Sequence, residues 1–210
     1  MLKISGRGQV PPFIVMDVMR AANERAVTGR DIFHLEVGQP STPAPQKVLE
    51  AAKKALSSQV LGYTDALGTP LLRERIATYY QSRYQVSLET DRVVVTTGSS
   101  GGFLLAFLSA FDFGDKVGLP VPSYPAYRNI LTALGLVVVD IPVGPDSHFQ
   151  PTPDILEPYL PGLDGLIIAS PSNPTGSMIK VSEMKALVEW CDRNEVRLIS
   201  DEIYHGITYG

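Results

Sequence analysis

The sequence predicts an α/β fold, in which a mainly parallel sheet carries helices on both faces. Apolar runs rich in β-branched residues recur along the second half of the chain. Segments with apolar residues at helical spacing separate most of these runs. Strands that alternate with helices favour a parallel sheet that is covered on both sides. The runs expected to form strands are 93–97, 116–121, 136–142, 166–170 and 197–201.

The intervening segments predict the helices of this sheet. They are 101–111, 124–134, a weaker one near 153–160, and 182–194. The last has an apolar stripe at helical spacing, and Ser182 is its expected N-cap.

The region before residue 90 predicts a different pattern. The first 30 residues are expected to form an arm with a helix after Pro12. A short strand at 32–37, a helix that begins near Pro43 and a second helix at 70–84 are expected to follow.

Composition narrows the class of protein. The 22 acidic residues exceed the 18 basic ones and give a formal charge of −4, which argues against nucleic acid as a partner. The single cysteine, Cys191, excludes a disulfide within one chain and fits a reducing compartment. No apolar run approaches the ~20 residues that span a bilayer, and the N-terminus lacks the apolar core of a signal peptide. A soluble, cytoplasmic protein without membrane contact is expected.

Ligands of parallel sheets collect at the carboxyl ends of strands, so binding and catalytic residues are expected at those ends. After the first expected strand, Gly98-Ser99-Ser100-Gly101-Gly102 opens a helix. The N–H groups of a helix start bind anions, and the serine hydroxyls add donors for a phosphate. An ordinary tight turn with serine capping is the alternative.

The segment after the expected strand 166–170 contains an asparagine between two prolines. Pro171 and Pro174 favour an extended, rigid segment around Asn173, which suits an amide that holds a donor towards a ligand. A turn that only reverses the chain is the alternative.

The last expected strand ends on a carboxylate. Asp201 follows an apolar run, and a buried carboxylate is costly unless donors or a cation satisfy it. Tyr204 follows three residues later. A helix or turn cap is one alternative, and a metal site that uses Asp201, Glu202 and His205 is another.

One cofactor satisfies all three strand ends. A phosphate would meet the turn at Gly98, a protonated ring nitrogen would meet Asp201, and a phenolate-like oxygen would meet Asn173 and Tyr204. The cofactor with these groups is pyridoxal 5′-phosphate.

At this point the chain resembles the class I/II aminotransferases of fold type I, over nearly its whole length and in the order of the family's motifs. One motif alone would be weak evidence, but six in the right order are specific. The matching segments are Leu35-Glu36-Val37-Gly38-Gln39-Pro40, Gly62-Tyr63-Thr64 with Gly68 and Leu72-Arg73, Thr97-Gly98-Ser99-Ser100, Pro122-Ser123-Tyr124-Pro125, Asn173-Pro174-Thr175-Gly176, and Asp201-Glu202-Ile203-Tyr204.

The resemblance implies roles around the pyridine ring. Asp201 would keep the ring nitrogen protonated, so that the ring acts as an electron sink. Asn173 and Tyr204 would hydrogen-bond the ring 3-oxygen. Tyr124 is similar to the aromatic residue that stacks on the ring face, although simple packing at a helix start is an alternative for it.

The resemblance also implies contacts at the ends of the ligand. Gly98, Ser99 and Ser100 would hold the phosphate, and Gly38 would place its backbone near the substrate carboxylate. Tyr63 is similar to a tyrosine that reaches the phosphate of the partner subunit's cofactor, which implies a homodimer with shared active sites. A loop aromatic that rests on the next helix is the alternative for Tyr63.

The same resemblance divides the chain. Residues 1–42 would form an N-terminal arm and part of a small domain, and residues 43–210 the N-terminal portion of the large domain that binds pyridoxal phosphate. The sheet is therefore expected to be incomplete.

The family's Schiff-base lysine lies downstream of the segment at Asp201. All seven lysines of this chain precede Asp201, so no catalytic residue is assigned. The expected function is an aminotransferase that acts on an amino acid and a 2-oxo acid, of which this chain is a fragment that is inactive alone. A C–S lyase of the same family, or a non-catalytic module for cofactor binding or dimerisation, is the alternative.

Overall fold

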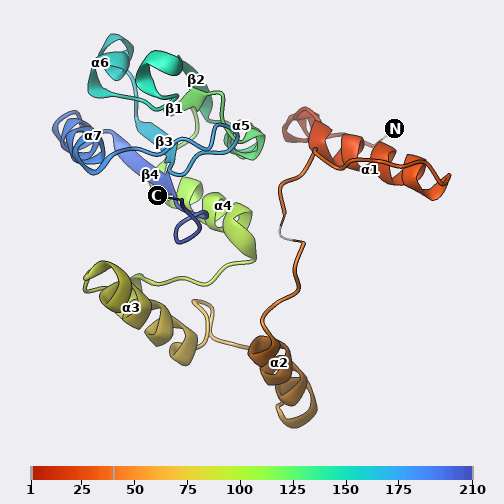
Figure 1. Cartoon of the computed structure of the whole chain (residues 1–210). Coiled ribbons are helices and arrows are strands. Elements are labelled where there is room, and N and C mark those ends of the chain that lie inside the picture. The colour runs from red at the N-terminus through yellow and green to blue at the C-terminus, as the bar shows by residue number, and fades with distance from the viewer. Residues whose placement is uncertain (1, 40, 210) are drawn as a thin grey trace. The chain divides into compact units, whose positions relative to one another are not determined.

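The chain forms two compact units. The computed structural model describes residues 2–39 and 41–209 (Figure 1). We call Met1–Pro12 together with Thr97–Gly210 the sheet unit, and Phe13–Thr96 the helical unit. The expected domain boundary at residue 42 stays a prediction.

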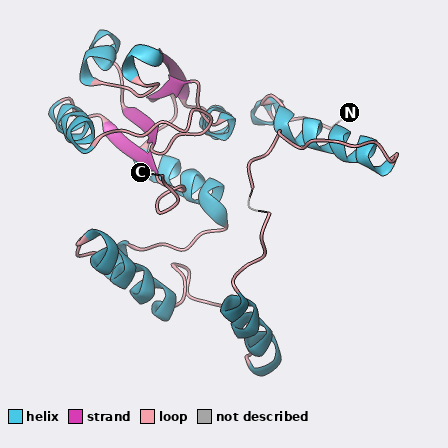
Figure 2. Ribbon diagram, in the orientation of Figure 1, coloured by secondary structure: helices cyan, strands magenta, loops and turns pink. Residues whose placement is uncertain are grey.

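The sheet unit is built on four parallel strands. They pair in the order β2-β1-β3-β4, so the α/β prediction is confirmed (Figure 2). Their bounds are β1 Lys116–Val121, β2 Val137–Pro142, β3 Gly165–Ala169 and β4 Arg197–Asp201. Each lies within one residue of its predicted range.

Helices connect these strands and cover both faces. They are α4 Gly98–Ala110, α5 Pro125–Leu134, α6 Pro153–Leu156 and α7 Val181–Arg193, with 3₁₀ turns at Gly6–Gln9, Pro145–Ser147 and Glu157–Tyr159. The helix predicted to begin at residue 101 begins three residues earlier. The predicted N-cap Ser182 is wrong by two positions, because Lys180 is the N-cap and α7 begins at Val181. The side chain of Glu183 accepts a hydrogen bond from the backbone N–H of Lys180 (3.0 Å).

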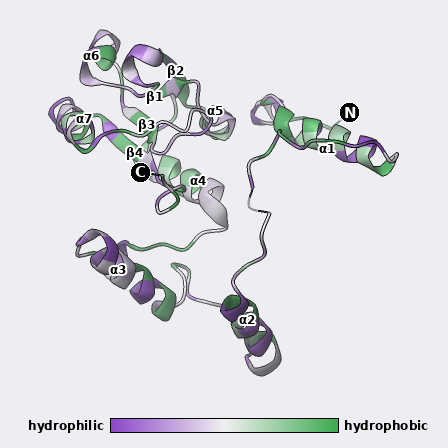
Figure 3. Ribbon diagram, viewed as in Figure 1, coloured by the Kyte–Doolittle hydropathy of each residue, from purple (hydrophilic) through white to green (hydrophobic). Residues whose placement is uncertain are grey.

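Two hydrophobic cores lie on opposite faces of the sheet. Leu166 and Ile168 of β3 face a core that contains side chains of α6 and α7, whereas Ile167 faces a core shared with α4 and α5. Figure 3 shows the hydrophobic colour along β3 and much of α4. A strand that is buried on both faces needs a continuous apolar run, and each such side chain contributes about 1.5–3 kcal/mol on burial.

Glycine is required at one point of β1 because the packing is close there. A Cβ atom added to Gly118 would lie 2.7 Å from Cδ1 of Ile141 and 3.1 Å from Cδ2 of Leu163. The side chains of β2 and of the segment before β3 therefore occupy the space beside this glycine.

The strand order locates the place where a ligand would bind. From β1 the chain passes through α5 to β2 on one side, and then crosses back to β3 on the other side of β1. The order thus reverses between β1 and β3. In open parallel sheets the crevice at the carboxyl ends of two such strands is the usual ligand site.

The described residues of the helical unit contain three helices, as the sequence predicted: α1 Ile14–Val27, α2 Gln46–Ser58 and α3 Pro70–Tyr84. In the part of this unit that the structure describes, none of the three helices has a buried side chain. Arg73 of α3 donates hydrogen bonds to the carbonyl oxygens of Val93 (3.0 Å) and Thr90 (2.6 Å), which attaches the 3₁₀ turn Thr90–Arg92 to α3.

Two predicted strands are wrong. Residues 32–37 and 93–97 both lie outside any ladder, and the N–H of Val95 donates instead to the carbonyl of Leu67 (2.9 Å). A strand exists only where a neighbouring strand pairs with it, and none of the four described strands pairs with these segments. No helix among residues 2–39 and 41–209 is long and apolar enough to cross a membrane.

Candidate functional site

The carboxyl edge of the sheet gathers three of the segments that the sequence singled out. β1 runs into Pro122 and Tyr124, β3 runs into the loop that contains Asn173, and β4 ends at Asp201. Ala169 and Asp201 are register partners, so β3 and β4 end at the same level. The parallel topology is what brings these separate stretches of sequence to one edge.

Asp201 is a half-buried carboxylate that has two donors. Its Oδ2 accepts a hydrogen bond from the hydroxyl of Tyr127, and its Oδ1 accepts one from the backbone N–H of Ile203 (3.1 Å). Charge-assisted bonds of this kind satisfy a carboxylate that burial would otherwise destabilise. The sequence indicated that the Asp201 carboxylate needs hydrogen-bond donors, and Tyr127 and Ile203 supply them.

Tyr127 is the site residue that the sequence analysis missed. Its side chain is only 2 % exposed. Burial, and then the hydrogen bond to Asp201, raise the pKa of Tyr127 well above its usual value near 10. The phenol therefore stays protonated and can donate to Asp201 at any physiological pH.

Aromatic neighbours fix the ring of Tyr127. Tyr124, which immediately precedes α5, meets it edge-on at a centroid distance of 5.4 Å, and Phe103 of α4 does so at 5.1 Å. A signal was present in the sequence, since Tyr127 follows Tyr124 by three residues and both lie on one face of a helix start. Tyr124 therefore packs against Tyr127 at the helix start, and its expected stacking on a cofactor ring stays a prediction.

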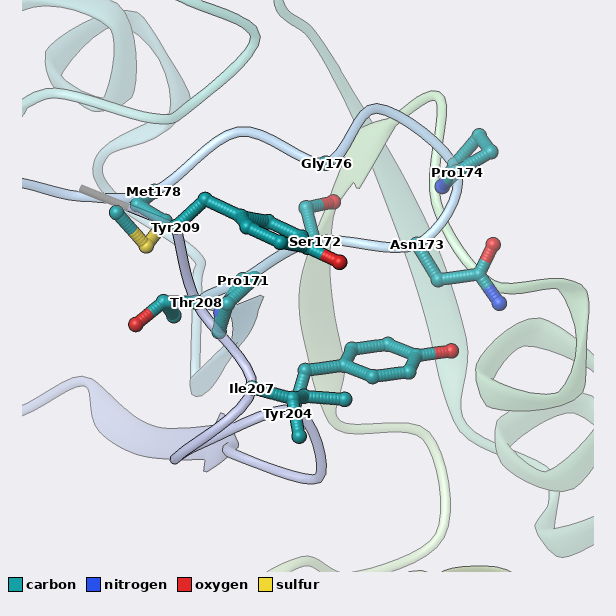
Figure 4. A pocket seen from close by; sticks show the side chains of 10 residues that line it. All are labelled: Pro171, Ser172, Asn173, Pro174, Gly176, Met178, Tyr204, Ile207, Thr208 and Tyr209. Carbon is teal, nitrogen blue, oxygen red and sulfur yellow. The ribbon is translucent and has the colours of Figure 1, made fainter. Parts of the chain in front are cut away.

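Asn173 and Tyr204 line one pocket at this edge (Figure 4). The pocket has an empty volume of about 920 Å³, part of it open to solvent. In Figure 4 the amide of Asn173 and the hydroxyl of Tyr204 point to the same side. The structure thus brings together the two side chains that were expected to act on one oxygen atom, and that role stays a prediction.

The loop that contains Asn173 is closed by its own hydrogen bonds. The N–H of Ser172 donates to the carbonyl of Ser177 (2.9 Å), and the N–H of Gly176 donates to the carbonyl of Ser172 (2.7 Å). Across the base, Ser170 Oγ accepts from the N–H of Ile179 (3.0 Å). Asn173 therefore lies at the tip of an ordered loop.

The serine-rich segment forms the first turn of α4. Gly98, Ser99 and Ser100 are exposed, and Gly98 has a φ of +76°, which favours glycine. The first turn of a helix presents backbone N–H groups that the helical ladder does not use. The position therefore suits an anion, and phosphate binding there stays a prediction.

Gly38 and Tyr63 lie in the helical unit, whereas the strand ends belong to the sheet unit, so the roles expected of these two residues stay predictions. Both are exposed, and the ring of Tyr63 is fully so, which excludes its alternative reading as an aromatic that rests on the next helix. Pro40, part of the motif around Gly38, lies outside the described residues.

The alternative metal reading has little support in the geometry. Asp201 is engaged by Tyr127, and Nδ1 of His205 lies 3.5 Å from Oε2 of Glu202. The residues that the structure describes contain no group of three or more His, Cys, Asp or Glu that is arranged to hold a metal ion.

Fold and site together define an α/β protein with a candidate ligand site at the carboxyl edge of a parallel sheet. The model of the family described as aminotransferase class I and II matches residues 30–210. The chain belongs to this family.

Individual relatives agree with this assignment. The chain is 54 % identical over 207 residues to a valine–pyruvate aminotransferase of Mycobacterium tuberculosis, a match that covers 99 % of this chain and 53 % of the relative. It is 33 % identical to an aspartate aminotransferase of Geobacillus stearothermophilus, which it matches over 100 % of this chain and 54 % of that one.

Solved structures show the same fold. A crystal structure of an aminotransferase from Mycobacterium tuberculosis matches with a TM-score of 0.96 at 54 % identity, over 100 % of this chain and 54 % of that chain. The aspartate aminotransferase of Thermus thermophilus with maleate matches with a TM-score of 0.95 at 30 % identity, over 100 % and 56 %. The chain spans about half the length of the relatives that it matches.

Proposed function

We propose that these 210 residues are the N-terminal part of an aminotransferase that uses pyridoxal 5′-phosphate and moves an amino group between an amino acid and a 2-oxo acid. The observation that carries this proposal is the carboxylate of Asp201, which Tyr127 holds at the end of β4, at the edge where Asn173 and Tyr204 share a pocket. Membership of the aminotransferase family supports it.

The donor set at this edge fits the cofactor. An ionised carboxylate is the partner that a protonated ring nitrogen needs, and Asp201 supplies it. Asn173 and Tyr204 offer donors to a phenolic oxygen, and Tyr124 would offer its ring face. The first turn of α4, with Gly98, Ser99 and Ser100, is suited to the phosphate.

When bound, pyridoxal phosphate supplies an electron sink for charge that develops on the α-carbon of an amino acid. The residues of this chain bind and orient. Tyr127 donates to one oxygen of Asp201 and fixes the plane of the carboxylate, while the N–H of Ile203 holds the other oxygen. Held in this way, Asp201 would keep a proton on the ring nitrogen of the bound cofactor.

Transamination also needs a group that moves a proton at the substrate α-carbon, which is a lysine in this family. Every lysine of this chain precedes Asp201, and none lies in the family's sequence context. We therefore expect the 210 residues to be inactive alone, with the lysine supplied by the half that the relatives have beyond the matched region.

The remaining assignments are part of the same proposal. Residues 1–42 would form the arm and part of a small domain, and residues 43–210 most of a large domain. Tyr63, whose ring is fully exposed, would reach the cofactor of a second subunit in a cytoplasmic homodimer. Gly38 would approach the substrate carboxylate.

The Mycobacterium tuberculosis relative suggests valine and pyruvate as the first substrates to test. A chain that carries these residues together with the half present in the relatives is expected to form alanine from this pair, measured by chromatography. The Asp201→Ala variant of that chain should lose at least 100-fold in rate, because the ring nitrogen loses its anion.

The 210-residue chain without the second half serves as the inactive control. Release of ammonia and a 2-oxo acid without amino transfer would favour the lyase instead. Absence of transfer from every amino acid in a broad panel would contradict the proposal.

A further inference from the structure

Gln150 is a buried amide that the proposed chemistry does not use. It is 5 % exposed, and Ser170 is the other polar side chain that is buried within the described part of the chain. Its Nε2 donates to the carbonyl oxygens of Ala169 and Ser177 and to Oγ of Ser177, each at 3.1 Å.

The two carbonyl groups mark the two ends of the loop that contains Asn173. Ala169 is the last residue of β3, and Ser177 follows the tip of the loop. Ser177 also accepts from the N–H of Ser172 across the loop (2.9 Å). One side chain from outside the loop therefore joins both of its ends.

A tightly hydrogen-bonded turn presents Gln150 to the loop. The N–H of Phe149 donates to the carbonyl of Gly144 (2.8 Å), and the N–H of Gln150 donates to that of Ser147 (3.0 Å). Gln150 also lines a small hollow at the point where the strand order reverses, together with Tyr127 and Ser172. Gln150 therefore contacts the loop that contains Asn173 and also lines a hollow together with Tyr127, the residue that donates to Asp201.

We propose that Gln150 is a positioning residue for Asn173, which holds the loop from residue 170 to 179 so that the Asn173 amide shares a pocket with Tyr204. The part-buried carbonyl groups of Ala169 and Ser177 would both lose this donor if the amide were removed, and we expect the loop to rearrange as a result. The consequence for cofactor binding rests on the proposed function, in which Asn173 meets the ring oxygen.

The Gln150→Met variant tests this, because it keeps the side-chain volume and removes the donors. In the 210-residue chain, hydrogen exchange at the N–H groups of Gly176 and Ser172 is expected to become at least tenfold faster. The dissociation constant of pyridoxal 5′-phosphate, from an absorbance titration, should rise at least fivefold. Ser177→Ala, which removes one acceptor and keeps Gln150, should produce a smaller change in the same direction.

Asn194→Leu is the matched control. The Asn194 side chain also donates an amide bond to a backbone carbonyl, that of Trp190 (2.8 Å), but it lies before β4 at the opposite edge of the sheet. It should change neither the exchange rates nor the dissociation constant more than twofold.

Combining Gln150→Met with Asn173→Ala shows whether Gln150 positions Asn173 or only stabilises the structure in general. If Gln150 acts through Asn173, Gln150→Met should not weaken cofactor binding further when Asn173 is already alanine. An equal loss in both backgrounds, or unchanged exchange at Gly176, would overturn the proposal. If the wild-type chain does not bind the cofactor, the proposed function fails, while the exchange rates still decide whether Gln150 holds the loop.

Discussion

At the scale of single residues, the pair formed by Tyr127 and Asp201 explains how a carboxylate is kept at the end of a buried strand. The phenol is buried between Tyr124 and Phe103, and its hydroxyl meets Oδ2 of Asp201. A tyrosine is suited to this position because its aromatic body packs in the core while its polar end donates. The neutral hydroxyl of Tyr127 thus orients the Asp201 carboxylate without placing a second charge beside it.

The Tyr127→Phe variant is expected to lose about 1–2 kcal/mol of unfolding free energy at pH 7, because a hydrogen bond to a half-buried carboxylate disappears. The raised pKa of Tyr127 means that its contribution is complete below pH 10 and is lost as the pH rises above 10. Wild-type stability should therefore fall more steeply above pH 10 than that of the variant, as measured by urea unfolding across pH.

Tyr159→Phe provides the control for this comparison, since Tyr159 is a half-buried tyrosine that packs on the opposite core. It should keep the alkaline slope of the wild type. The same slope in Tyr127→Phe as in the wild type would show that folding does not raise the pKa of Tyr127.

The sequence could predict Asp201, Asn173 and Tyr204 as candidates because each follows a recognisable strand end. It could not show that Tyr127 donates to Asp201, because the two are 74 residues apart and meet only when the sheet forms. Gln150 lies in a loop and gives no local signal at all. Its burial depends on contacts with a loop that follows a different strand.

At the scale of elements, the four strands of the sheet could be predicted because each is an apolar run bounded by turn residues. The segments 32–37 and 93–97 have a similar local pattern and form no strand. The difference is not local, since a strand also needs a neighbour to pair with. Helix positions were predicted well, whereas the first turn of α4 was missed because Gly98 and two serines are weak helix formers.

The close packing between β1 and its neighbours gives a prediction at this scale. Gly118→Val is expected to destabilise the chain by about 2–3 kcal/mol, because the added atoms would collide with Ile141 and Leu163. Thermal unfolding followed by circular dichroism measures the effect.

Gly144→Ala is the matched control, since an added Cβ there meets nothing within 4 Å and its φ of −140° is open to any residue. It should leave the midpoint of unfolding nearly unchanged. Equal effects of the two substitutions would contradict the packing described around β1.

At the scale of the whole molecule, the topology of the sheet unit makes one site from distant stretches of sequence. β1, β3 and β4 end at one edge, and the strand order reverses between β1 and β3. Two cores hold the helices against both faces, so the loops at this edge rest on a rigid base. The chain spans about half the length of the relatives that it matches.

The proposed role of Asp201 as the anchor of pyridoxal 5′-phosphate at this edge is tested by an absorbance titration of the 210-residue chain with the cofactor. We predict saturable binding of one cofactor per chain, weakened at least tenfold in Asp201→Ala. The control Asp192→Ala, which removes an exposed carboxylate of α7, should change it less than twofold. Binding that is equally strong in Asp201→Ala and in the wild type would show that Asp201 does not anchor the cofactor.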